Sequence, residues 1–120
     1  MTHQDINRIR KLYTLKASSI PNFIDTKNYL DKSVWEFMKS IYCIMSKLSV
    51  NTIVTNKRIN EVYIEYKDYM DELERFCPYD MLLNVSDELY STLEYTLELC
   101  EDYELYEMAA NFKKFKDLSN

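Results

Sequence analysis

Hydrophobic residues recur at steps of three and four along most of this chain, which is the spacing of one face of an α-helix. The pattern predicts a first helix over about residues 3–18. Its hydrophobic positions are Ile6, Ile9, Leu12 and Leu15. Ser18, Ser19 and Pro21 are expected to end this helix, because the residue before a proline disfavours helical backbone. Residues 21–30 are then a connection or a short helix.

A second helix is predicted to begin at Ser33, because Ser33 and Glu36 have the S-x-x-E spacing of a capping box. Its hydrophobic positions are Val34, Phe37, Ile41, Ile44, Met45 and Leu48. This line is dense enough for a central helix. Trp35 stands beside it, and we expect it to cover the edge of the core, although tryptophan is also a common anchor of protein interfaces.

The β-branched stretch 50–55 is predicted to be a loop, since a lone strand would have no partner. Thr55 or Asn56 should begin a third helix, and Pro78 should stop it at Cys77. The hydrophobic positions of the third helix are Ile59, Val62, Tyr66, Tyr69, Leu73 and Phe76. Its other side is acidic.

The last part of the chain predicts one turn of helix over 79–84 and a new helix capped by Asn84 or Ser86. A polar break at 101–104 separates that helix from a final one over about 105–117. The hydrophobic positions of the two helices are Leu89, Leu93, Leu97 and Cys100, followed by Met108, Phe112 and Phe115.

These elements predict an all-α fold: a compact bundle of four or five helices that ends in a helical hairpin, with residues 1–120 as one α-helical domain. The 120 residues contain no glycine and two prolines, and 47% of them are hydrophobic. Glycine supplies the positive φ of phosphate-binding loops, nucleophile elbows and tight β-hairpins. Its absence therefore argues against nucleotide-binding motifs and a many-stranded fold.

Charge divides the chain into two halves. The first sixty residues carry ten Lys/Arg and four Asp/Glu, whereas the last sixty carry five and sixteen. The acidic half also holds eight of the eleven tyrosines. Such a chain can present differently charged surfaces to partners, which favours a binding function over a catalytic one.

Residues that usually carry catalysis or bind metals are scarce. There is one histidine, near the start of the chain, and Cys43, Cys77 and Cys100 are far apart and form no C-x-x-C pair. No carboxylate pair is set into an apolar run in the manner of a general acid and base. We therefore expect no enzymatic activity, no metal site and no cofactor.

The sequence also predicts a cytoplasmic protein that has no contact with a membrane. No apolar run approaches the roughly 20 residues of a membrane span, and the start lacks the apolar core of a signal peptide. Three scattered cysteines suit a reducing compartment.

One segment near the end of the chain carries a recognisable pattern. Its residues are Tyr106, Glu107, Ala109, Ala110 and Phe112. With this pattern, residues 93–118 resemble the UVR motif, a short helical hairpin of the B and C subunits of the bacterial excision-repair nuclease. That hairpin pairs with another copy of itself, so the resemblance implies a protein-protein element and a possible homodimer. Lys113 and Lys114 replace an Arg-Asp pair of the family. The residues expected to pack the hairpin are Ala109, Ala110 and Phe112.

The acidic, tyrosine-rich half is the predicted binding surface, because tyrosine offers a large contact area at a small cost in rotamer entropy. The residues expected to contact a partner are Glu61, Glu65, Tyr66, Asp68, Tyr69, Glu72, Tyr103 and Tyr106. Four of these are acidic residues on one face of the third helix, and a solvated helix face is the alternative interpretation.

The resulting hypothesis is a small interaction protein that inhibits or regulates a host or defence protein. Lys, Asn, Ile and Tyr, whose codons are AT-rich, make up a third of the chain, which favours an AT-rich genome such as that of a phage or mobile element, a poxvirus or a low-GC bacterium. Two alternatives remain: a nucleic-acid mimic that blocks a DNA- or RNA-binding enzyme, and an adaptor that self-associates through the UVR-like hairpin. The net charge of −5 disfavours direct nucleic-acid binding.

Overall fold

A computed structural model describes residues 3–23 and 29–119, and these residues fold into five helices. The helices are α1 His3–Phe23, α2 Tyr29–Ser46, α3 Asn56–Phe76, α4 Tyr79–Asp102 and α5 Tyr106–Ser119. No strand occurs in this described part of the chain. The predicted all-α bundle that ends in a helical hairpin is therefore confirmed.

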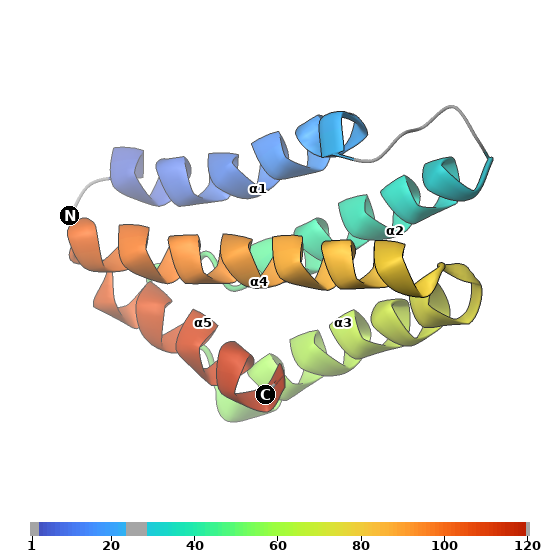
Figure 1. Ribbon diagram of the computed structural model, residues 1–120. Helices are drawn as coiled ribbons and strands as arrows, with labels where there is room; N and C mark the ends of the chain where they lie inside the picture. The colour runs from blue at the N-terminus through green and yellow to red at the C-terminus, as the bar shows by residue number, and fades with distance from the viewer. Residues whose placement is uncertain (1–2, 24–28, 120) are drawn as a thin grey trace.

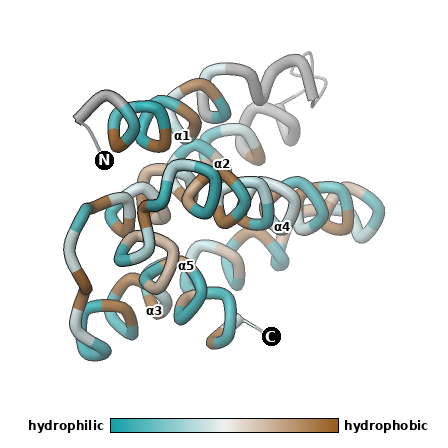
Figure 2. Tube along the Cα trace, turned by 90° about the vertical axis from the view of Figure 1, so that its left-hand side faces the viewer, coloured by the Kyte–Doolittle hydropathy of each residue, from teal (hydrophilic) through white to brown (hydrophobic). Residues whose placement is uncertain are grey.

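The helix α4 crosses the front of the bundle, with α1 along one side, α5 and α3 along the other, and α2 behind (Figure 1). The molecule is flattened, with principal extents of 43 × 27 × 17 Å. Figure 2 shows hydrophobic and hydrophilic residues recurring in turn along the coloured parts of the helices. This alternation is what lets every helix turn one side toward a shared core.

The predicted end of the first helix is wrong, because α1 continues through Ser18, Ser19 and Pro21 to Phe23. The Ser18 hydroxyl lies 3.1 Å from the carbonyl oxygens of both Thr14 and Leu15. A serine that bonds back to its own helix does not cap it. Pro21 removes a single backbone hydrogen bond, and it does so in the last turn. Residues 24–28 of the predicted connection lie outside the described residues.

The capping box at Ser33 is also wrong, because α2 already begins at Tyr29 and Ser33 lies inside it. No glycine or proline stands between residues 22 and 46 to stop the helix from extending upstream. The predicted hydrophobic line is correct: Val34, Ile41 and Met45 are buried. Leu48 belongs to the turn after α2 and is also buried.

Both ends of α3 match the sequence prediction. Thr55 caps the helix by accepting a hydrogen bond from the backbone N–H of Arg58, and Cys77 ends it before Pro78. The loop before α3 is fixed by Asn111 of α5, which is buried. Its amide oxygen accepts from Val54 N at 2.8 Å, and its amide nitrogen donates to the Thr52 carbonyl at 2.8 Å.

The predicted break near residue 84 is wrong, because α4 is one continuous helix from Tyr79 to Asp102. Val85 is fully buried and extends the hydrophobic line of Leu89 and Leu93 by one turn. Burial of this line outweighs the weak preference of Asn84 and Ser86 for caps.

The turn between α4 and α5 forms a Schellman motif without glycine. Leu105 N donates to the Cys100 carbonyl at 2.7 Å, and Glu104 N donates to the Glu101 carbonyl at 3.1 Å. Glu104 has a φ of 57°, the left-handed conformation that glycine adopts most easily. Leu105 and Cys100 are both buried, which supplies the hydrophobic contact of the motif.

Two tyrosines occupy the centre of the core. The hydroxyl of Tyr13 lies 2.8 Å from that of Thr96, and the hydroxyl of Tyr42 lies 3.3 Å from that of Thr92. The ring of Tyr13 also stacks on Phe112 with a centroid distance of 5.7 Å. The two hydroxyl contacts join α1 and α2 to the inner side of α4, and the ring contact joins α1 to α5. The helix α4 is thus held in one orientation, with its other side turned outward.

Candidate protein-binding surface

The outward side of α4 is acidic and aromatic. The helix contains seven Asp/Glu and no Lys or Arg. Its buried residues form a single inner line: Val85, Leu89, Thr92, Leu93, Thr96 and Cys100. Residues on the opposite side of the helix from this line point away from the core, because a helix repeats every 3.6 residues.

Three tyrosines stand on this outward side. Tyr79 is 72% exposed, Tyr90 52% and Tyr95 49%. Leu83 lies one turn after Tyr79 and is also exposed. An exposed tyrosine ring leaves a large apolar area that a partner can cover. We define the α4 surface by its exposed tyrosines and carboxylates: Tyr79, Asp80, Leu83, Asp87, Tyr90, Tyr95 and Glu98.

Ion pairs flank the α4 surface on both sides. Glu88 pairs with Lys16 of α1, with 2.8 Å between the ammonium and a carboxylate oxygen, and Glu94 pairs with Lys116 of α5. The hydrogen bond from Lys116 lowers the pKa of the Glu94 carboxyl, and the same bond raises the pKa of Lys116. The Lys116 ammonium also lies 5.7 Å from the centroid of the Tyr90 ring.

The carboxylates between these flanks are left without a cation. Within the described residues, no Lys or Arg forms an ion pair with Asp80, Asp87 or Glu98. All three side chains are exposed. The α4 surface therefore has a local negative potential that a basic partner can neutralise.

The acidic residues predicted on α3 lie on its outer side but are partly neutralised. Glu61 pairs with Arg58 at 3.3 Å, Glu65 with Lys47 at 3.0 Å, and Glu72 with Arg75 at 2.6 Å. Asp68 is exposed. Because three of the four carboxylates already have an intramolecular cation, α3 offers less unpaired charge than α4.

The tyrosines predicted to bind a partner separate into two groups. Tyr66 packs edge-on against Phe115 with centroids 5.1 Å apart, and Tyr69 packs against Phe37 at 5.7 Å. Both are partly buried against the core, and burial raises the pKa of Tyr66. They contribute to packing between helices rather than to an open surface.

Tyr103 and Tyr106 lie on either side of the turn between α4 and α5. The Arg8 side chain donates to the Tyr103 hydroxyl at 3.4 Å, and its guanidinium carbon lies 5.5 Å from the ring centroid. Tyr103 is thus engaged with α1. Tyr106 is 62% exposed, so most of its ring is open to solvent.

The hairpin packing residues behave differently from one another. Phe112 is fully buried, whereas Ala109 and Ala110 are partly buried, with Ala109 against the core. The helices α4 and α5 are joined into the antiparallel hairpin seen in Figure 1.

Sequence reasoning missed Tyr79, Tyr90 and Tyr95 as surface residues. Two signals were available in the sequence: α4 has no basic residue, and these tyrosines fall off its hydrophobic line. The position relative to the hydrophobic line also excludes Tyr66 and Tyr69 from the surface tyrosines, because both fall on the hydrophobic line of α3.

Further site types find no support among the described residues. They contain no group of three or more His, Cys, Asp and Glu side chains placed to hold a metal ion. None of their helices is both long and apolar enough to cross a membrane.

Comparisons with known proteins add no relative. No protein-family model, no curated protein and no solved structure matches this chain.

Proposed function

We propose that the protein acts by binding another protein through the α4 surface and that it performs no catalysis. The observation that carries this proposal is the combination, on the outward side of α4, of three exposed tyrosines with carboxylates that lack an intramolecular cation. Tyrosine is enriched at the buried centre of protein interfaces, and unpaired charge steers an oppositely charged partner. The partner is expected to present a basic surface with apolar pockets.

The biological setting that we propose is inhibition or regulation of a host or defence protein by a phage or mobile element. The support is compositional: residues with AT-rich codons form a third of the chain. The α4 surface supplies the physical means, because a rigid helix face needs little reorganisation on binding.

Mimicry of nucleic acid is the second candidate, and the absence of Lys and Arg from α4 favours it. A row of carboxylates can occupy a site that normally binds phosphates. The exposed tyrosines separate the two candidates. An interface that buries tyrosine rings keeps most of its affinity at high salt, whereas a purely electrostatic mimic loses it.

The proposed function is tested by capture of partners from a lysate of the source cell or its host, with identification by mass spectrometry. Wild-type protein is compared with a Tyr79→Ser, Tyr90→Ser, Tyr95→Ser variant. The matched control, Leu15→Ser, Ile53→Ser, Ile64→Ser, removes three exposed apolar side chains elsewhere. We expect one partner that the control retains and the tyrosine variant loses.

Washes at about 0.1 M and about 0.5 M salt distinguish the remaining outcomes. The higher salt shortens the electrostatic screening length from about 10 Å to a few Å. A protein partner that survives both washes supports the proposal. A nucleic-acid enzyme that is released by salt and by competing DNA supports mimicry instead. Equal capture by the wild type and the tyrosine variant contradicts a role for the α4 surface, and recovery of the protein alone points to self-association.

A further inference from the structure

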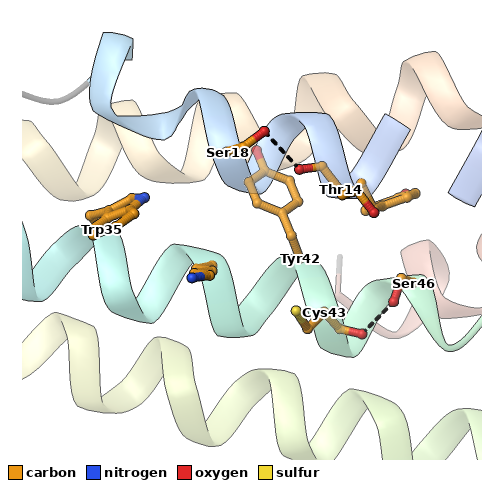
Figure 3. Close-up of a pocket in the computed structure, with 8 residues that line it drawn as sticks. Thr14, Ser18, Trp35, Tyr42, Cys43 and Ser46 are labelled. Carbon is orange, nitrogen blue, oxygen red and sulfur yellow. Dashed lines mark hydrogen bonds between the residues drawn. The ribbon is translucent and has the colours of Figure 1, made fainter. Parts of the chain in front are cut away.

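A cavity of about 390 Å³ opens between α1 and α2, away from the α4 surface. Its lining residues are Tyr13, Thr14, Ser18, Trp35, Lys39, Tyr42, Cys43 and Ser46. Figure 3 shows Tyr42 reaching from α2 toward Ser18 on α1, with Trp35 placed between the same two helices. The volume lies at the lower end of the range for small-molecule sites, about 300–1,000 Å³.

Aromatic rings form the apolar part of the cavity. Tyr13 and Tyr42 are buried, and their hydroxyls are bonded to Thr96 and Thr92 of α4. Both tyrosines therefore turn their polar ends toward α4, and their buried rings form the floor beneath the cavity. Trp35 adds a third ring, which is partly buried.

The polar rim offers one group that can bind an anion. The hydroxyls of Thr14, Ser18 and Ser46 donate to backbone carbonyls of their own helices, at 3.4, 3.1 and 2.6 Å. Lys39 is the one charged residue among the described residues that line the cavity. Its ammonium lies 5.4 Å from the Trp35 ring centroid, and no carboxylate of the described residues forms an ion pair with it.

We propose that this cavity is a binding site for a small aromatic carboxylate. The ring of the ligand would pack against Trp35, above the buried rings of Tyr13 and Tyr42, and its carboxylate would accept a charge-assisted hydrogen bond from Lys39. One cation at the rim beside one accessible aromatic ring selects an aromatic molecule with a single negative charge at one end. The proposal does not depend on partner binding by α4, because none of the residues of the α4 surface lines the cavity.

Two residues of the cavity are natural reporters. Trp35 is the single tryptophan of the chain, so tryptophan fluorescence reports on the cavity alone. Cys43 is exposed, whereas Cys77 and Cys100 are buried, and burial raises the pKa of the Cys100 thiol to about 11. A thiol reagent should therefore modify Cys43 first, and a ligand in the cavity should slow that reaction.

The experiment titrates the full-length protein with phenylbutyrate while Trp35 fluorescence and the rate of Cys43 alkylation are followed. Phenylbutanol, which keeps the ring but lacks the charge, and octanoate, which keeps the charge but lacks the ring, are the comparison compounds. We expect saturable binding of phenylbutyrate with a Kd of about 1 mM or tighter, as for a small ligand with few non-hydrogen atoms. Phenylbutanol and octanoate should each bind at least about five-fold more weakly.

The variant Lys39→Met tests the assigned anion contact, and because Lys39 is exposed, the substitution should leave the fold intact. It should weaken phenylbutyrate about ten-fold, the loss expected for a hydrogen bond to a charged group, and change phenylbutanol less than about two-fold. Circular dichroism of the variant checks the fold. Absence of saturation up to about 10 mM overturns the proposal. So do equal affinities for the three compounds, or unchanged phenylbutyrate affinity in the folded Lys39→Met variant.

Discussion

The inner and outer faces of α4 use similar residues for opposite purposes. On the inner face, Thr92 and Thr96 hold the hydroxyls of Tyr42 and Tyr13, and each threonine hydroxyl also lies within hydrogen-bond distance of a backbone carbonyl of its own helix. On the outer face, the tyrosines and carboxylates lie in water. The difference shows that burial, rather than residue type, decides whether a tyrosine serves the fold or remains free for a partner.

The comparison also explains how the core tolerates buried polar side chains. Every inward polar side chain among Thr92, Thr96 and Asn111 has a protein partner, so none carries the cost of an unsatisfied buried group. Outward polar groups have no such requirement. Substitutions should therefore be costly on one face and nearly neutral on the other.

The largest expected effect contrasts Tyr13→Ala with Tyr95→Ala. Tyr13 is buried against Phe112 and Tyr42, so its truncation leaves a cavity and should lower the free energy of unfolding by about 3–5 kcal/mol. Tyr95 is on the outer face, where substitution should change stability by less than about 0.5 kcal/mol. Denaturation with urea, followed by circular dichroism, measures both. Similar losses for the two variants would refute the distinction between the faces.

The second prediction concerns alkaline pH. Burial raises the pKa of Tyr42 to about 12 from an ordinary value of 10.0, and burial also raises the pKa of Tyr13. A phenol whose pKa is higher in the folded state stabilises the fold below pH 10, and this contribution is lost as the pH rises toward 12. Tyr42 alone should cost about 3 kcal/mol over that range. Cys100, with its pKa raised to about 11, begins to lose its contribution near its ordinary value of 9.0.

Urea midpoints measured from neutral pH to strongly alkaline pH follow this loss. The control is Tyr42→Phe, which gives up the hydrogen bond to Thr92 at neutral pH but cannot ionise. Its stability should therefore depend less on pH above 10 than that of the wild type. Identical pH profiles for the two proteins would contradict the assignment of Tyr42 as an inward, protonated group.

A third prediction concerns the buried amide of Asn111. In Asn111→Ala the backbone N–H of Val54 and the carbonyl of Thr52 lose their partner, and we expect a loss of about 2–3 kcal/mol. Asn60→Ala on α3, an exposed position, is the matched control and should stay within about 0.5 kcal/mol. Hydrogen exchange should also show faster exchange at Val54 in the Asn111 variant alone. Unchanged exchange at Val54 would contradict the assigned role of Asn111 in fixing the loop before α3.

The sequence predicts most helices because their hydrophobic lines are long and regular. Thr55, Cys77 and Pro78 mark both ends of α3, and the α5 stripe of Met108, Phe112 and Phe115 is buried as expected. Boundaries fail where a local signal competes with packing. Nothing adjacent in the sequence indicates that burial of Val85 will carry α4 through its two candidate caps.

The candidate site was harder to predict, since it depends on contacts between distant residues. The Lys16 that pairs with Glu88 lies 72 residues away in the sequence, and the Arg8 that engages Tyr103 lies 95 residues away. The sequence places Tyr66 both on a hydrophobic line and on the predicted binding surface, and the structure places it against Phe115. The position of a tyrosine relative to the hydrophobic line of its helix was the better guide.

The smallest expected effect is a gain of stability from a substitution at Glu104, in the turn that follows α4. Glu104 is exposed but holds a left-handed φ of 57°, while the adjacent Leu105 is buried. Glycine adopts this conformation without the steric cost of a Cβ atom, so Glu104→Gly should stabilise the protein by about 0.5–1 kcal/mol. Glu104→Ala is the control, because it removes the same charge and keeps the Cβ. If urea denaturation gives both variants the same gain, the benefit comes from reduced repulsion within the acidic half. A gain confined to glycine assigns it to the backbone of the turn, and partner binding through the α4 surface should then be unchanged.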